Sequence, residues 1–211
     1  MRKHYKMRIG IYGGAFDPIH LGHINPILEI VQKHKLEKVH FIPTHISNSN
    51  KKIEASAEER LFMIRKSLED IGNFVVDDRE ITRGGKSFTY DSIQEIKAEY
   101  PEAQLYCIVG DDLLTNIISW KSFEEIIKLS NILVTRRDRS GKVITDNKVS
   151  CYMTQNESIF HDQSYGKIFI ENTSIVDVSS KEIRHRLKNN KSISGLVNIN
   201  LERWLEKNKV Y

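Results

Sequence analysis

Short apolar runs alternate along the chain with segments of helical periodicity. Runs of this length, bounded by Gly, Pro or polar residues, predict buried β-strands. They lie at residues 8–12, 39–42, 74–76, 105–109 and 132–134, and the run at 105–109 is the most strand-like. Residues 138–166 are polar and carry no clear period, so the sequence predicts no element there.

The segments between these runs predict helices. After the first run, apolar residues occur at i, i+3, i+4 and i+7, at Ile24, Ile27, Leu28 and Val31. Towards the end of the sequence, Leu201, Trp204 and Leu205 predict one amphipathic helix.

Three Ser-x-x-Glu pairs add predicted helix starts, at Ser56, Ser122 and Ser179. In such a capping box the serine and the glutamate each satisfy a backbone N–H group of the first turn.

Strands that alternate with helices predict the α/β fold class. We expect a Rossmann-like parallel sheet with helices on both faces.

Composition limits the class of protein. The chain has 211 residues, so we assign 1–211 to a single domain, with 1–6 as an N-terminal extension and 179–211 as a C-terminal helical part. The net charge of +4 is low for a dedicated nucleic-acid binder. No stretch approaches the ~18 apolar residues of a membrane span, so we expect a cytoplasmic protein that binds neither membranes nor nucleic acids. The sequence does not define the oligomeric state, and a homo-oligomer is compatible with it.

Glycine and polar residues cluster where the predicted strands end, which is where parallel sheets bind ligands. The densest cluster is 13–23, Gly-Gly-Ala-Phe-Asp-Pro-Ile-His-Leu-Gly-His. A glycine turn that leads into a helix offers backbone N–H groups and the positive end of the helix dipole to a phosphate. The cluster matches neither the dinucleotide-binding nor the P-loop pattern, so hydride transfer and kinase chemistry lose their usual fingerprints.

His20 and His23 lie three residues apart near the predicted helix start, so they share one helical face. Two histidines alone can be a pair of ordinary residues or half of a metal site, and these two interpretations together carry about half the weight. Metal binding would need a third ligand, and no carboxylate stands at H-E-x-x-H spacing, so we assign no protein metal site. Beside a phosphate-binding turn, the better interpretation is a pair of donors that stabilise a transferring phosphoryl group.

Residues 13–23 resemble the first signature of the nucleotidylyltransferase superfamily, whose H-x-G-H element is shared in kind with class I aminoacyl-tRNA synthetases. His20, where the related pantetheine-phosphate enzymes usually have Thr, resembles the nicotinate mononucleotide adenylyltransferase family. Residues 178–184, Val-Ser-Ser-Lys-Glu-Ile-Arg, are similar to the second signature, (I/V)-S-S-x-x-I-R. Residues 86–92 and 108–112 resemble two intermediate markers of the same family.

The resemblance implies adenylyl transfer from ATP to nicotinate mononucleotide, which gives nicotinate adenine dinucleotide and pyrophosphate in NAD biosynthesis. The phosphate of the mononucleotide would attack, so no protein nucleophile is needed. His20, His23 and Arg184 would be catalytic, and Mg²⁺ would arrive with the ATP. The residues that the resemblance assigns to ATP are Gly13, Gly14, Ala15, Phe16, His20, His23, Asp112, Ser179, Ser180, Ile183 and Arg184.

For the acceptor, the resemblance implies that Trp120 stacks on the pyridine ring. The backbone N–H groups of Thr89 and Lys121 would bind the nicotinate carboxylate, and Arg137 stands where the family has an Arg after the next strand. Without the resemblance, Trp120 would be interpreted as a packed aromatic residue under a loop, and Arg137 as a solvated charge.

One segment departs from the family. Residues 43–52 lack the Pro-Pro-His element whose basic end helps to bind the mononucleotide phosphate, so either His45, Lys51 or Lys52 replaces it or the acceptor differs. The alternatives are adenylyl transfer to nicotinamide mononucleotide or phosphopantetheine, or a catalytically silent nucleotide-binding regulator. Both histidines and Arg184 are present, which argues against the silent protein.

Overall fold

The fold is built on a parallel six-stranded sheet of order β3-β2-β1-β4-β5-β6. The computed structural model describes residues 6–48, 52–136 and 147–211, so Lys51 and Arg137 lie outside the described residues. The strands are β1 (Arg8–Gly14), β2 (Lys38–Pro43), β3 (Phe74–Val76), β4 (Gln104–Gly110), β5 (Asn131–Thr135) and β6 (Ile168–Glu171).

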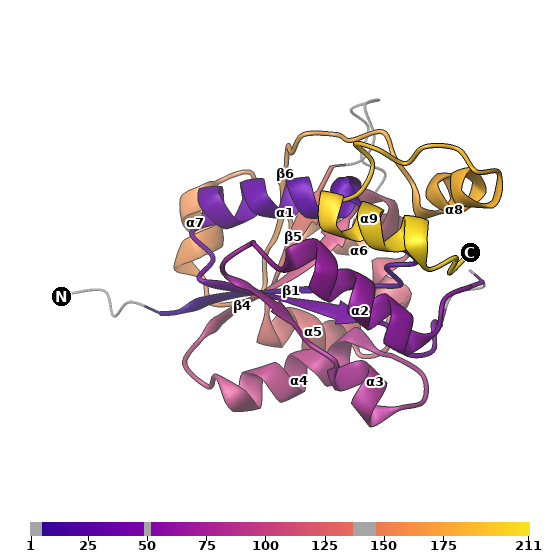
Figure 1. The fold of residues 1–211 in the computed structure, drawn as a ribbon. Coiled ribbons are helices and arrows are strands. Elements are labelled where there is room, and N and C mark those ends of the chain that lie inside the picture. Colours follow the sequence, from indigo (N-terminus) through magenta and orange to yellow (C-terminus); the bar gives the residue numbers. More distant parts are fainter. Residues whose placement is uncertain (1–5, 49–51, 137–146) are drawn as a thin grey trace.

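Helices cover both faces of this sheet (Figure 1). One apolar layer contains residues of α1 (Leu21–His34), α2 (Ala57–Leu68), α7 (Glu157–Asp162), α8 (Ser180–Lys188) and α9 (Ile199–Lys207). The other layer contains residues of α4 (Thr89–Glu99), the 3-10 helix η1 (Asp111–Ser119), α5 (Phe123–Leu129) and α6 (Asn147–Ser150). A short helix, α3 (Arg79–Arg83), joins β3 to α4. The predicted α/β class is therefore confirmed.

The central strands are apolar because they are covered on both sides. In β4, Tyr106 and Ile108 face one apolar layer, whereas Cys107 and Val109 face the other. Gly10 of β1 marks a close approach, since a Cβ atom there would lie 2.9 Å from Ile108 Cδ1. Glycine at this position lets neighbouring side chains pack directly against the strand backbone.

Most elements agree with the sequence pattern, and two points differ. Every predicted strand is present, but β6 and the helices α6 and α7 arise in or just after the segment for which no element was predicted. A helix does begin after Ser122, as predicted, but the capping box there is wrong, because Ser122 has a φ of 59° and its side chain makes no cap hydrogen bond. Ser56 and Ser179 do cap their helices, each accepting from the backbone N–H group three residues on.

The strand order reverses between β1 and β4, which makes the carboxyl ends of these two strands the switch point of the sheet. Ligands of open α/β sheets bind in the crevice beside such a point. The predicted phosphate-binding turn follows β1 directly, and Asp111 and Asp112 follow β4. The topology therefore places both predicted nucleotide-binding segments at one edge of the sheet.

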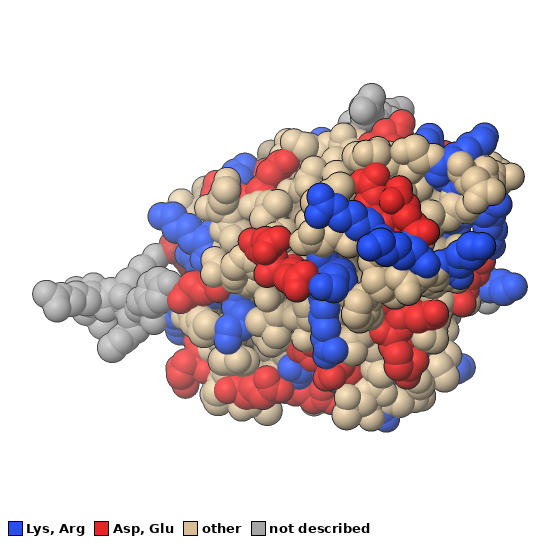
Figure 2. Space-filling view, viewed as in Figure 1, with Lys and Arg blue, Asp and Glu red and all other residues tan. Residues whose placement is uncertain are grey.

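Charges of both signs are interspersed over the face of the molecule in Figure 2. Among the described residues, no helix is both long enough and apolar enough to cross a bilayer.

Candidate active site

Buried polar contacts hold the turn after β1. Asp17 is 3% exposed, and its carboxylate accepts hydrogen bonds from the backbone N–H groups of Glu54 at 2.8 Å and Ala55 at 3.0 Å. Phe16, with a φ of 49°, lies buried against the turn, and a Cβ atom on Gly14 would come within 3.0 Å of its ring. Gly14 and Phe16, both predicted to bind ATP, thus shape the turn itself.

His20 and His23 lie together at the start of α1, as their spacing predicts. The backbone N–H group of His20 donates to Nδ1 of His23 at 3.2 Å, and the two ring centroids are 3.7 Å apart. Because Nδ1 of His23 accepts a hydrogen bond, the neutral ring carries its proton on Nε2.

The second signature contacts the first directly. Ser180 Oγ donates to the carbonyl oxygen of Pro18 at 2.8 Å, and Arg184 Nη1 donates to the carbonyl oxygen of Asp17 at 2.6 Å. Gly22 permits this approach, because a Cβ atom there would lie 3.0 Å from His20 Nδ1 and 3.1 Å from Val178 Cγ1. Two motifs that are far apart in the sequence therefore form one site.

Charged groups surround the turn. Arg60 is 1% exposed, and its Nη1 donates to the carbonyl oxygen of Ala15 at 2.8 Å. Burial lowers the pKa of the Arg60 guanidinium, although the nearby Asp17 carboxylate opposes that shift. Tyr211 donates its hydroxyl proton to Asp17 Oδ1 at 2.9 Å, and both burial and the Asp17 charge raise the pKa of this phenol.

A surface ion-pair group links α8 to the segment before α2. Arg184 Nε donates to Glu54 Oε1 at 3.0 Å, and Lys188 pairs with the other carboxylate oxygen. The hydrogen bond from Lys188 is the largest cause of the lowered pKa of Glu54, and Arg184 adds to it. Glu54 thereby connects the second signature to the loop in which the acceptor phosphate was predicted to bind.

The residues predicted to bind the acceptor include His45 in the loop after β2, Thr89 at the start of α4, and Lys121 in the turn between η1 and α5. The backbone N–H group of His45 donates to Ser87 Oγ at 2.9 Å, which joins the loop after β2 to the loop before α4. Lys121 forms an ion pair with Asp91 at 3.1 Å, and its ammonium lies 4.3 Å from the centroid of the Phe88 ring. Thr89 is the first residue of α4, and the Lys121 side chain reaches the first turn of that helix through Asp91.

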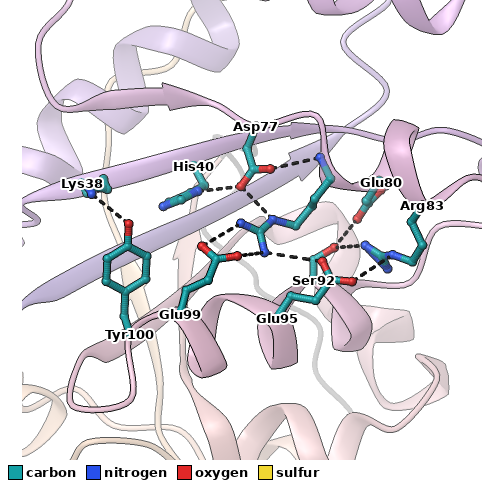
Figure 3. A network of polar contacts seen from close by, with 10 residues as sticks. Lys38, His40, Asp77, Glu80, Arg83, Ser92, Glu95, Glu99 and Tyr100 are labelled. Atoms are coloured by element: carbon teal, nitrogen blue, oxygen red, sulfur yellow. Dashed lines mark hydrogen bonds and ion pairs between the residues drawn. The ribbon is translucent and has the colours of Figure 1, made fainter.

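A polar network fixes α3 and α4 on either side of the 84–88 loop (Figure 3). Arg79 donates to Asp77 at 2.8 Å and to Glu99 at 3.0 Å, and Asp77 also accepts from His40 Nδ1 at 2.6 Å. Burial by itself would raise the pKa of Asp77, but the hydrogen bonds from His40 and Arg79 bring it below its ordinary value. A lowered carboxyl pKa adds stability at neutral pH that is lost as the pH falls through the folded-state value.

The remaining predicted residues are scattered around these two groups. Trp120 is half-buried against the apolar layer of α4 and α5, which is also what a packed aromatic residue would show. Asp112 is exposed in the first turn of η1, and Lys52 is exposed in the loop between β2 and α2. Nothing in the described residues tests Lys51 or Arg137.

Sequence reasoning missed Arg60, Glu54 and Tyr211, which hold the turn from other parts of the chain. Asp17 lies inside the first signature and was available to notice, since an aspartate before Pro in a glycine turn is a common acceptor of backbone N–H groups. Arg60 and Tyr211 carry no local signal. Arg60 lies in a segment with the pattern of an ordinary amphipathic helix, and no motif surrounds Tyr211.

A glycine turn with histidine donors at the switch point of a parallel sheet is the arrangement of a nucleotide-binding enzyme of the Rossmann-like class. A family model described as cytidylyltransferase-like matches residues 11–186.

Proteins of similar sequence define the family more closely. A Psychromonas ingrahamii protein named "Probable nicotinate-nucleotide adenylyltransferase" is 31% identical over 208 residues, covering 96% of each chain. One with the same name from Borrelia hermsii is 30% identical and covers 97% of this chain and 98% of its own. The chain belongs to the cytidylyltransferase-like family and, within it, to the nicotinate-nucleotide adenylyltransferases.

Solved structures agree with the fold. Plasmodium falciparum nicotinic acid mononucleotide adenylyltransferase complexed with NaAD aligns with a TM-score of 0.72 at 20% identity, over 95% of each chain. The same protein complexed with APC aligns with a TM-score of 0.70 at 18% identity, over 96% of each chain. At 18–20% sequence identity, this structural similarity shows a shared fold.

Proposed function

We propose that this chain transfers the adenylyl group of ATP to nicotinate mononucleotide, releasing nicotinate adenine dinucleotide and pyrophosphate as a step of NAD biosynthesis. Full-length similarity to relatives of that name supports the acceptor. The observation that carries the reaction class is the contact between the two signatures, through Ser180 and Arg184 on the turn that carries His20 and His23.

The chemistry needs positioned charge rather than a protein nucleophile. A 5′-phosphate oxygen of the mononucleotide attacks the α-phosphorus of ATP, a new P–O bond forms, and the bond from the α-phosphorus to the bridging oxygen breaks. Pyrophosphate leaves with that bonding electron pair. Negative charge shifts onto the leaving group, so donors placed there lower the barrier.

His20, His23 and Arg184 supply these donors in our proposal. The Nε2 proton assigned to His23 by its hydrogen bond would point to a phosphate oxygen. Arg184 already holds the turn through the carbonyl oxygen of Asp17, and its planar guanidinium carries further N–H groups for the triphosphate. The remaining ATP contacts would come from Gly13, Gly14, Ala15, Phe16, Asp112, Ser179, Ser180 and Ile183.

The acceptor would lie between the loops joined by His45 and Ser87. Trp120 would stack on the pyridine ring, and the N–H groups of Thr89 and Lys121 would receive the nicotinate carboxylate. His45 is the described basic residue closest in sequence to the end of β2, and it is tied to the 84–88 loop by its hydrogen bonds. Lys51 and Lys52 are the other candidates for its phosphate, and Arg137 would also bind the nicotinate nucleotide.

A divalent metal ion would enter with the nucleotide, and we propose that it is Mg²⁺. Mg²⁺ binds phosphate oxygens and keeps several waters, so it needs no dedicated set of protein ligands. The ion would therefore be part of the nucleotide substrate.

Side-by-side assays of the purified chain test this function. ATP and Mg²⁺ are supplied with nicotinate mononucleotide, nicotinamide mononucleotide or phosphopantetheine, and pyrophosphate release is followed. We expect the highest kcat/KM with the nicotinate form. Preference for another acceptor would overturn the acceptor assignment, and ATP binding without pyrophosphate release from any acceptor would support a silent nucleotide-binding protein.

A further inference from the structure

A second polar cluster lies at the other end of α1 from the site. His34, the last residue of α1, is fully buried. Its Nε2 lies 2.9 Å from Oε2 of Glu171 at the end of β6, and its Nδ1 lies 3.2 Å from Nε2 of His161 on α7. Nδ1 of His161 lies in turn 2.9 Å from the hydroxyl oxygen of Tyr106. Each imidazole is therefore held by a polar partner on one nitrogen and directs its other nitrogen to the second ring.

These contacts decide where the protons lie. Glu171 pairs with Lys33 Nζ at 2.6 Å and accepts, so His34 carries its proton on Nε2 and presents a lone pair at Nδ1. The Tyr106 hydroxyl can donate or accept, so His161 can hold its proton on Nδ1 and present a lone pair at Nε2. A carboxylate or hydroxyl behind the outer nitrogen is the partner that orients a metal-binding histidine.

A carboxylate completes the set. Glu157 lies one turn before His161 on α7, and its Oε1 is 3.6 Å from His161 Nε2. One ligand atom from each of His34, Glu157 and His161 can lie within 4.8 Å of the other two. Ligand atoms bound tetrahedrally at about 2.0–2.1 Å are about 3.3–3.4 Å apart, close to the two separations found here.

We propose that His34, Glu157 and His161 bind one divalent transition-metal ion of the Zn²⁺ type. His34 Nδ1, His161 Nε2 and a Glu157 oxygen are the ligands, and Glu171 and Tyr106 orient the two rings. His161 and Glu157 line a cavity of about 420 Å³, so the fourth coordination position faces solvent. The proton between the two rings moves to His161 Nδ1, so no proton is lost on binding.

The ligand types and the charges around the cluster limit which ion it can bind. Arg8, Lys33 and Lys35 line the same cavity and oppose any cation, although Glu171 neutralises Lys33. Hard ions such as Mg²⁺ prefer oxygen ligands and gain little from two imidazoles, whereas Zn²⁺ and Co²⁺ bind them well. The cations nearby also favour an anion or a hydroxide in the fourth position. The site is therefore distinct from the Mg²⁺ that accompanies ATP.

Metal titration of the untagged, full-length chain tests this site. Isothermal titration calorimetry with ZnCl₂ in excess Mg²⁺, and metal analysis after dialysis, should show one saturable equivalent. Co²⁺ in its place should give the visible absorption of a tetrahedral complex. Glu157→Gln and His161→Gln should each weaken Zn²⁺ binding by about 100-fold or more, and Tyr106→Phe by about tenfold, because it removes only an orienting partner.

Matched substitutions control this experiment. His185→Gln and Glu206→Gln change an exposed histidine and an exposed glutamate elsewhere, and both should bind Zn²⁺ like the unaltered chain. Glu157 is exposed, so its variant keeps the test valid even where His161→Gln fails to fold. Absence of a saturable equivalent, or equal Zn²⁺ affinity in Glu157→Gln and Glu206→Gln, would overturn the proposal. The outcome is independent of the acceptor of the adenylyl group.

Discussion

The hydrogen bond from Tyr211 to Asp17 provides a sharp test of how the turn is held. Tyr211→Phe removes one hydroxyl group and keeps the ring, which packs against the apolar layer of α2. The lost contact is the 2.9 Å bond to Asp17 Oδ1. Because burial raises the pKa of Tyr211, the hydroxyl is protonated and donates at neutral pH.

The expected cost follows from the charge and the burial of this bond. Hydrogen bonds to charged groups contribute about 1.5–3 kcal/mol, and Tyr211 is only half-buried, so we expect about 1.5 kcal/mol. In a chain of this size, 1 kcal/mol shifts Tm by about 2–4 °C, which gives a decrease of about 3–6 °C. Urea denaturation and differential scanning calorimetry would measure the free energy of unfolding and the Tm.

Tyr165→Phe is the matched control, since Tyr165 is 56% exposed. We expect this variant to unfold within about 1 °C of the unaltered chain, as most surface substitutions do. If Tyr211→Phe falls in the same narrow range, Asp17 is held sufficiently by Glu54 and Ala55, and the reasoning about Tyr211 is wrong.

Other substitutions separate binding, chemistry and packing. His23→Ala should lower kcat by about 10²–10³-fold with little change in Tm, because it removes a charge-stabilising donor; unchanged turnover would exclude this role. Trp120→Ala should chiefly raise the KM for the pyridine nucleotide, since stacking also acts in the ground state. An unchanged KM with a lower Tm would identify Trp120 as a packing residue. Gly22→Ala should cost about 1–3 kcal/mol and lower activity, because its methyl group would press on the His20 ring and on Val178. Equal stability and activity in that variant would show that the two segments separate easily.

The core of the fold was predictable because central parallel strands are buried on both faces. β1, β4 and β5 carry nearly continuous apolar runs, which identify them as strands buried on both faces. β6 lies at the edge of the sheet, follows a polar segment, and includes the charged Glu171, so its signal was diluted. At Ser122 the residue types of a capping box are present, but the left-handed backbone turns the side chain away from the first turn.

The site was predictable only where its chemistry is local. His20 and His23 are joined by a contact within one helical turn, and sequence spacing finds such pairs. The partners of Asp17 come from distant segments, and nothing near Tyr211 in the sequence reveals the contact. The same holds for His34 and His161, which lie 127 positions apart and meet only because α7 packs beside the end of α1.

The shared use of Asp17 makes the parts of this turn interdependent. Its carboxylate accepts from Glu54, Ala55 and Tyr211, and its carbonyl oxygen accepts from Arg184. When one donor is lost, the carboxylate keeps the others and stays paired, whereas loss of Asp17 leaves several buried donors without their acceptor. Single substitutions at Tyr211 and Arg184 should therefore not add in the double variant, since residues that share a partner couple by about 0.5–3 kcal/mol. Because Arg184 would also bind phosphate, this coupling ties the stability of the turn to the affinity for ATP.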